Sequence, residues 1–395
     1  MAKWFFGSSF FLFLGNWIGI VALNWYVFEQ YQNPVYLGWV NFVRLIPVLG
    51  LSLYAGKMCD IYSRSFLIKL CGSLSFILTV VLTTTVLAFD QLEFWVILSY
   101  ACLRGCVSAF ETPVRNAILP IFSANTSKSK VVSNYSLVLN ICRSIGPAIA
   151  GFLLGFGWIS LTFAFQSFCL FISLILSLPI KVQPIEGSLR KKKSFALKEV
   201  KNYFSKDVTG RNLFLASLIA MVFGFSYTTI LPVLTDFYFP GEAEVFGIAM
   251  TLAALGAIVA TLTLPKILVH VKEEAMCYMS LLFFAFSLLS VLIPIKAFLF
   301  ISLFSIGLFG QWTRSSNRIY FQNKVPEEKR GKVLSVVLMD RGMIPLGALL
   351  ISFLVGWKGV IFAFVVMGVG TSLSTINYWK LKIHKSKKRV NRLAN

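Results

Sequence analysis

The feature that most constrains this chain is its succession of long apolar runs. Each run holds about 20 residues with few charges, which is the length that an α-helix needs to cross a bilayer. Only 13% of the residues are charged, about half the share of an ordinary water-soluble domain. We therefore expect lipid to be the solvent. We predict an all-α protein with twelve spans, at residues 4–28, 35–56, 65–89, 93–117, 131–155, 160–180, 213–237, 245–268, 276–294, 297–318, 333–355 and 359–379.

The charges alternate along the chain with the predicted loops. The formal net charge is +21, and the cations gather in every second loop and in the tail at 380–392, whereas the loops between them are mainly acidic. This is the positive-inside pattern, which predicts that both termini are cytoplasmic. Because the charge follows topology and does not form one basic face, a nucleic-acid partner is excluded.

One lysine-rich segment, 181–212, interrupts the membrane pattern and divides the chain. We predict an N-terminal six-helix bundle at 1–180, this basic cytoplasmic linker, a C-terminal six-helix bundle at 213–379, and a basic tail at 380–395. Apolar residues are spaced among the lysines of the linker, as in an amphipathic helix on an anionic leaflet. A simple solvated linker is the alternative.

An internal repeat supports the division into two bundles. Arg143 precedes Pro147 by four residues in the fifth predicted span, and Arg341 precedes Pro345 by four in the eleventh. Matching positions in two halves are typical of duplicated transporter chains.

The sequence offers no site for enzymatic chemistry. It contains no phosphate-binding loop of the G-x-x-x-x-G-K-[ST] type, no Ser/His/Asp constellation and no metal-ligand cluster. The seven cysteines lie in or beside apolar helices, where small-residue packing explains them. We expect neither an enzyme nor a cofactor, and energy must come from an ion or substrate gradient.

The loop after the second predicted span resembles the G-x-L-A-D-R-x-G-R-[KR] motif of the major facilitator superfamily. Gly56, Asp60 and Arg64 match, whereas Ile61 and Ser63 depart from the pattern. In the family, the aspartate lies near a helix end of the opposite half and helps to hold the cytoplasmic side closed. The resemblance implies a weakened latch and a more populated inward-open state.

A second motif lies in the fifth span, where Gly146, Pro147 and Gly151 resemble the G-P-x-x-G-G motif of exporting members of the superfamily. Small residues let helices approach closely, and proline bends a helix. Residues 104–120 and 326–333 further resemble the branch that includes the enterobactin exporter and the macrolide efflux pumps. This resemblance implies a monomeric secondary transporter in the cytoplasmic membrane of a bacterium.

Three arginines, Arg44, Arg104 and Arg143, lie ten to twelve residues into their predicted spans, near the bilayer midplane. A charge there is costly unless it faces a water-filled cavity or a partner. Glu29 and Glu111 are predicted nearer the membrane edges, so the guanidinium groups are expected to be unpaired. Arginine suits carboxylates, which predicts an anionic, carboxylate-rich substrate. Helix packing and, for Arg104, a coupling role remain alternatives.

Other candidate residues surround these arginines. Polar or stacking contacts with the substrate are predicted for four residues, although packing explains each as well: Asn16, Trp17, Asn140 and Tyr227. Roles in coupling or gating are predicted for a further set: Gly56, Asp60, Arg64, Glu29, Glu111, Gly146, Pro147, Gly151, Asp340 and Arg341.

Together these features predict a proton-coupled exporter of a small organic anion, with a polycarboxylate siderophore as the substrate that best fits the family branch. The partners are then the substrate, membrane lipid and protons. Multidrug or macrolide efflux is the first alternative and lysophospholipid transport the second. A non-transporting sensor would need a signalling domain, and uptake is open because the direction depends on one motif.

Overall fold

The computed structural model describes residues 1–89, 91–123, 128–182, 197–326, 333–334, 336–337 and 339–375. Its helices are α1 (Ala2–Tyr31), α2 (Pro34–Ile61), α3 (Arg64–Ala88), α4 (Phe94–Ile118), α5 (Lys128–Gly155), α6 (Ile159–Ser177), α7 (Leu197–Lys206), α8 (Val208–Ile219), α9 (Tyr227–Tyr238), α10 (Ala243–Ile267), α11 (Glu273–Ser290), α12 (Lys296–Lys324) and α14 (Ile344–Leu373). Three short elements are η1 (Leu119–Ser123), η2 (Ala220–Gly224) and η3 (Met339–Met343). Strands are absent from these residues, so the predicted all-α class is confirmed.

The helices agree with the predicted twelve crossings. Ten helical segments in the described residues are long and apolar enough to cross a membrane, and one of them combines α8, η2 and α9. Helix α2 has a similar length. Helix α14 makes two crossings, because Gly359 adopts a left-handed backbone (φ 82°) at which the chain turns back. The predicted break between the ninth and tenth spans is also found, between Ser290 and Lys296.

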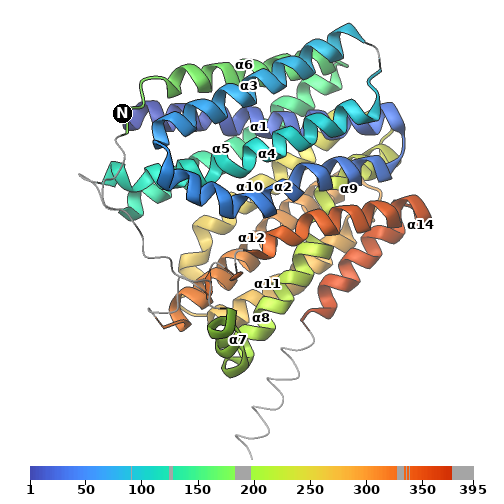
Figure 1. Cartoon of the computed structure of the whole chain (residues 1–395). Coiled ribbons are helices and arrows are strands. Elements are labelled where there is room, and N and C mark those ends of the chain that lie inside the picture. The colour runs from blue at the N-terminus through green and yellow to red at the C-terminus, as the bar shows by residue number, and fades with distance from the viewer. Residues whose placement is uncertain are drawn as a thin grey trace, which may run out of the picture.

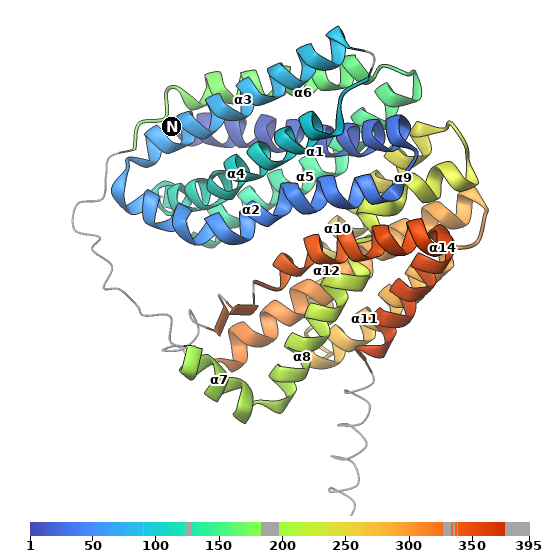
Figure 2. The same ribbon diagram turned by 45° about the vertical axis from the view of Figure 1, so that its right-hand side comes forward.

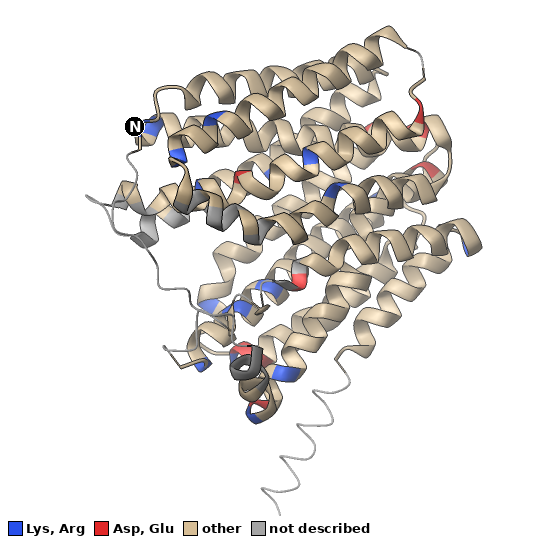
Figure 3. Cartoon of the chain, in the orientation of Figure 1, with Lys and Arg blue, Asp and Glu red and all other residues tan. Residues whose placement is uncertain are grey.

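The helices form two groups that meet at one end. Figures 1 and 2 show α1–α6 on one side and α8–α14 on the other, with the N-terminus and α7 at the end where the groups diverge. We call this the terminal end, and the end that carries the α1–α2 turn and Gly359 the opposite end. Lysines and arginines gather towards the terminal end (Figure 3). The bundle boundaries at 180 and 213, and the side of the membrane that each end faces, stay predictions.

Small residues join the two groups tightly at the opposite end. Gly151 of α5 and Gly247 of α10 lie so close that a Cβ on either would collide with the backbone of the other. A Cβ on Gly38 of α2 would lie 2.6 Å from the Cβ of Ser352 in α14. The Trp25 and Phe246 rings stack between the groups at 6.2 Å. The opposite end is therefore closed by direct helix contact, as small residues permit in membranes.

The linker does contain a helix, α7, which packs on the C-terminal group. The Tyr203 hydroxyl donates to Asp207 Oδ2 at 2.8 Å, and the Tyr320 hydroxyl of α12 donates to the same oxygen at 3.1 Å. The Phe204 and Phe214 rings stack at 5.2 Å. Asp207 also accepts a bond from the Gly210 amide at 2.9 Å and so caps α8. Contact of α7 with lipid stays a prediction.

Candidate functional site

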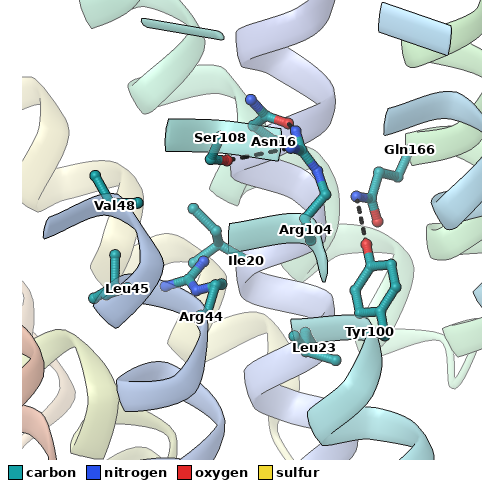
Figure 4. A pocket seen from close by; sticks show the side chains of 11 residues that line it. Asn16, Ile20, Leu23, Arg44, Leu45, Val48, Tyr100, Arg104, Ser108 and Gln166 are labelled. Carbon is teal, nitrogen blue, oxygen red and sulfur yellow. Dashed lines mark hydrogen bonds between the residues drawn. The ribbon is translucent and has the colours of Figure 1, made fainter. Parts of the chain in front are cut away.

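A cavity of about 170 Å³ lies within the N-terminal group, at the middle turns of α1, α2, α4 and α6. Figure 4 shows its side chains around a common space, with Arg104 among polar side chains on one side and Arg44 among the aliphatic side chains on the other. Its lining consists of Asn16, Gly19, Ile20, Leu23, Arg44, Leu45, Val48, Tyr100, Arg104, Ser108 and Gln166. Three of the predicted substrate residues, Asn16, Arg44 and Arg104, are thus brought together.

Two glycines determine how the cavity wall is built. A Cβ on Gly105 would collide with the carbonyl of Arg44, so only glycine lets α4 approach α2 at this level. Likewise, a Cβ on Gly19 would occupy the space of the Gln166 amide, which donates to the Tyr100 hydroxyl at 3.4 Å. Close approach through glycine is how membrane helices bring polar side chains into one cavity.

Arg44 is held at one side of its guanidinium group. Its Nη2 donates to Asn41 Oδ1 at 2.8 Å, and Asn41 in turn donates to Asn24 Oδ1 at 2.8 Å. Its Nε is buried without a hydrogen-bond partner among the described residues. An unsatisfied buried donor is costly, so this edge of the guanidinium group is suited to an anionic ligand.

Arg104 is paired, which corrects the prediction that all three midplane arginines are unpaired. Its Nη2 lies 3.3 Å from Glu111 Oε2, and the two side chains are only 7% and 5% exposed. The same nitrogen donates to Asn16 Oδ1, and Nη1 donates to Ser108 Oγ at 3.2 Å. Ser75 Oγ donates to Glu111 Oε1 at 2.6 Å. Glu111 lies two turns after Arg104 on the same helix face, so it is deeper than predicted.

Arg143 and its predicted neighbours lie apart from this cavity. The Arg143 guanidinium lies 5.6 Å from the centre of the Trp17 ring, a cation–π contact between α5 and α1. Gly146 permits this approach, since a Cβ there would lie 2.6 Å from Trp17 Cβ. Tyr227 is 3% exposed at the start of α9. The side chain of Asn140 lies outside the described residues.

The predicted gating residues are distributed over both ends of the molecule. Arg64 Nη1 donates to the Ala117 carbonyl at 2.8 Å and so ties α3 to the end of α4. Glu29 is exposed near the end of α1. Asp340 is buried and accepts a hydrogen bond from Ser217 of α8. The surroundings of Gly56 and the side chains of Asp60 and Arg341 lie outside the described part of the structure.

The repeated arginine–proline motif adopts two different local structures. Pro147 lies inside α5, four residues after Arg143 in the same helix. Arg341 belongs instead to the short helix η3, and Pro345 stands in the first turn of α14. Proline suits a first helical turn because its missing N–H has no partner to lose there.

One arginine of the C-terminal group was not among the predicted site residues. The Arg314 guanidinium of α12 lies 4.4 Å from the centre of the Phe225 ring, and its Nη2 donates to Gln311 Oε1 at 2.9 Å. The rule that identified Arg44, a charge inside an apolar span, also identifies Arg314. Gln166 and Tyr100 were missed as well. The span of Gln166 holds no charge to mark it, whereas Tyr100 lies four residues before Arg104 and could have been identified from that spacing.

The arrangement can bind an organic anion. Two guanidinium groups, amides and hydroxyls can hold a carboxylate, and the side chains of Ile20, Leu23, Leu45 and Val48 can contact an apolar portion. Among the described residues, no group of three or more His, Cys, Asp or Glu side chains could hold a metal ion.

Comparison with known proteins gives a consistent assignment. The family model described as transmembrane secretion effector matches residues 2–393. A staphyloferrin A transporter of Staphylococcus aureus is 46% identical over 392 residues, which cover 98% of this chain and 99% of the relative. Macrolide efflux protein A of Streptococcus pyogenes is 21% identical and covers 88% of this chain and 87% of its own length. The crystal structure of the nucleoside transporter NupG shares the fold, with a TM-score of 0.78 at 13% identity over 96% of this chain and 98% of that one.

Proposed function

This chain belongs to the transmembrane secretion effector family of major facilitator transporters, and from that premise we propose that it exports an anionic polycarboxylate siderophore. The chain is a multi-pass membrane protein and a transporter, not an enzyme. The observation that carries the proposal is the midplane cavity lined by Arg44 and Arg104. The relative named for staphyloferrin A supports the same substrate class.

The two arginines suit carboxylate recognition for different reasons. Arg44 lines the cavity with a buried Nε that has no hydrogen-bond partner among the described residues, whereas Arg104 is oriented by Asn16 and Glu111 while it lines the cavity. A preorganised guanidinium binds a carboxylate with little further loss of conformational entropy. Charge-assisted hydrogen bonds to such groups contribute about 1.5–3 kcal/mol each. A substrate with several carboxylates therefore gains the most binding free energy from these two arginines.

We propose that the structure represents a state closed at the extracellular side. The closed opposite end carries the Gly151–Gly247 contact, and Gly151 belongs to the motif that resembles those of exporting members. With both termini cytoplasmic and the protein in a bacterial cell membrane, as the charge pattern predicts, the cavity loads from the cytoplasm. The transport unit is a monomer in contact with membrane lipid.

We propose that Glu111 couples transport to protons by orienting Arg104. Two effects of protonating Glu111 oppose each other. Loss of the negative charge favours an anion at Arg104, whereas loss of the ion pair releases Arg104 from its position. Because Arg104 lines the cavity while it is paired, we propose that orientation dominates. A proton then weakens substrate binding, which gives exchange of protons for the siderophore.

The experiment uses a bacterium that makes staphyloferrin A but lacks its own exporter, grown with limiting iron. Cells that express the full chain are compared with cells that carry an empty vector. Mass spectrometry measures the siderophore in the medium and in the cell extract. We expect the chain to move the compound from the cells to the medium.

A second candidate function is macrolide efflux. The aliphatic wall of the cavity and the pairing of Arg104 with Glu111 favour it, and the Streptococcus pyogenes relative carries that name. An unchanged distribution of siderophore together with new macrolide resistance would refute siderophore export and support macrolide efflux.

A further inference from the structure

The crossing formed by α8, η2 and α9 is broken in its middle. The π-helical turn η2 covers Ala220–Gly224, and the chain then turns at Phe225 and Ser226 before α9 begins. Ser226 Oγ donates to the Val222 carbonyl at 2.7 Å, and glycine at position 347 leaves space for this hydroxyl. Packing thus holds the break in place. Single π-helical turns inside α-helices are frequent at functional sites.

Arg314 lies beside this break. Its guanidinium stacks on the Phe225 ring at 4.4 Å and bonds Gln311 of its own helix at 2.9 Å. It stands ten residues before the end of α12 at Lys324, well inside the crossing. A charge at this depth marks a functional position, because lipid alone does not tolerate it.

A second guanidinium approaches the same place from the other group of helices. Arg143 of α5 stacks on Trp17 at 5.6 Å, and both Arg143 and Arg314 interact electrostatically with the Tyr227 hydroxyl. Tyr227 is 97% buried. Two cations and a buried phenol that can donate a hydrogen bond therefore converge from opposite halves.

We propose that Arg143, Arg314 and Tyr227 form a second carboxylate subsite at the interface of the two halves. One carboxylate of the substrate binds Arg44 and Arg104, and another binds this cluster. The substrate class is then organic acids that carry at least two well-separated carboxylates. The aromatic faces of Trp17 and Phe225 orient the two guanidinium groups, and guanidinium groups suit carboxylate binding. This inference rests on the proposed export of a polycarboxylate siderophore.

The test uses the full chain in proteoliposomes that transport staphyloferrin A. Linear dicarboxylates of increasing length, from succinate to sebacate, compete with the siderophore, and monocarboxylates of equal length serve as references. In the wild type, the second carboxylate should improve competition about tenfold at one preferred length. Arg314→Gln should abolish this advantage and raise KM for the siderophore about tenfold, with a smaller change in kcat. Arg314→Lys should lose part of both effects.

The matched control is Arg318→Gln, which removes the same charge from an exposed position of α12. Its KM for the siderophore should stay within about twofold of the wild-type value, because exposed charges contribute little to binding. Size-exclusion profiles and thermal unfolding confirm that each variant is folded. If Arg314→Gln keeps the length preference of the wild type, the second subsite is refuted while the proposed function stands. If wild-type vesicles transport no siderophore, the proposed function itself fails.

Discussion

The two halves of the molecule place arginine in the membrane by different means. In the N-terminal half, Arg104 is held by an ion pair with Glu111, in a network that includes Asn16 and Ser75. In the C-terminal half, Arg314 stacks on Phe225 beside a broken helix. Protonation of the partner carboxylate can change the position of a paired arginine, whereas stacking on a ring does not depend on protons. A duplicated architecture can thus divide coupling and binding between its halves.

The largest effect is expected for Arg104→Gln, which tests the role of the paired arginine. It removes the substrate contact and leaves Glu111 buried without its ion-pair partner, which costs about 3–5 kcal/mol. We expect transport to fall by more than about a hundredfold and the midpoint of thermal unfolding to fall as well. Transport in proteoliposomes and unfolding of the purified protein measure the two effects.

The double variant Arg104→Gln with Glu111→Gln separates stability from binding. Without either charge, the buried pair is replaced by two amides, and thermal stability should recover most of its loss. Transport should stay low, because the guanidinium is still absent. Recovery of transport in the double variant would refute direct binding by Arg104.

The pH dependence of binding sharpens the contrast between paired and stacked arginine. Under the orientation hypothesis, the ion pair between Glu111 and Arg104 supports binding, so affinity should be higher at high pH than at low pH. Glu111→Gln should bind about tenfold more weakly at high pH and lose this dependence. Arg314→Gln should bind the siderophore weakly but keep the pH dependence of binding. The other ionisable groups near Glu111 are Arg104, Arg115, Cys71 and Tyr135.

Equilibrium binding of staphyloferrin A between pH 5 and 8, followed by tryptophan fluorescence, makes this measurement. Tighter binding by Glu111→Gln than by the wild type would show that the charge effect dominates. The coupling would then have the opposite sign.

The smallest expected effect concerns the contact between the halves. Gly151→Ala places a Cβ against the backbone of Gly247, and overpacking of this kind costs about 1–3 kcal/mol. We expect the population of the state that is closed at the opposite end to fall by about tenfold or more. Distances between spin labels across this end report the change. Gly50→Ala, where an added Cβ meets nothing within 4 Å, should leave the distances unchanged.

Much of the fold was predictable because hydropathy directly reports the length of each crossing. The predicted span 65–89 compares with α3 at Arg64–Ala88, and the motif at Gly146–Gly151 indeed lies at close helix contacts. The π-helical turn before Phe225 was not predictable, because one glycine in an apolar run does not by itself mark it and packing against α11 and α14 holds it in place.

The site was predictable only in part, for reasons of depth and composition. Arg44, Arg104 and Asn16 converge as expected, because charges in apolar spans must share polar surroundings. Glu111 was placed too near the membrane edge, although its spacing of seven residues from Arg104 already indicates a shared helix face. Arg314 was overlooked because the polar residues around it lower the hydropathy of its span.

The closed opposite end has a consequence for the surroundings in which such a protein can work. Its tightest described contacts between the halves are glycine backbones and aromatic rings, such as Gly151 with Gly247 and Trp25 with Phe246, although Glu244 of α10 also lies beside Gly155 of α5. Contacts without charge are not screened by salt and do not titrate. The glycine and ring contacts of this closure therefore keep their strength in dilute and in saline media, so salt alone does not loosen the barrier to leakage.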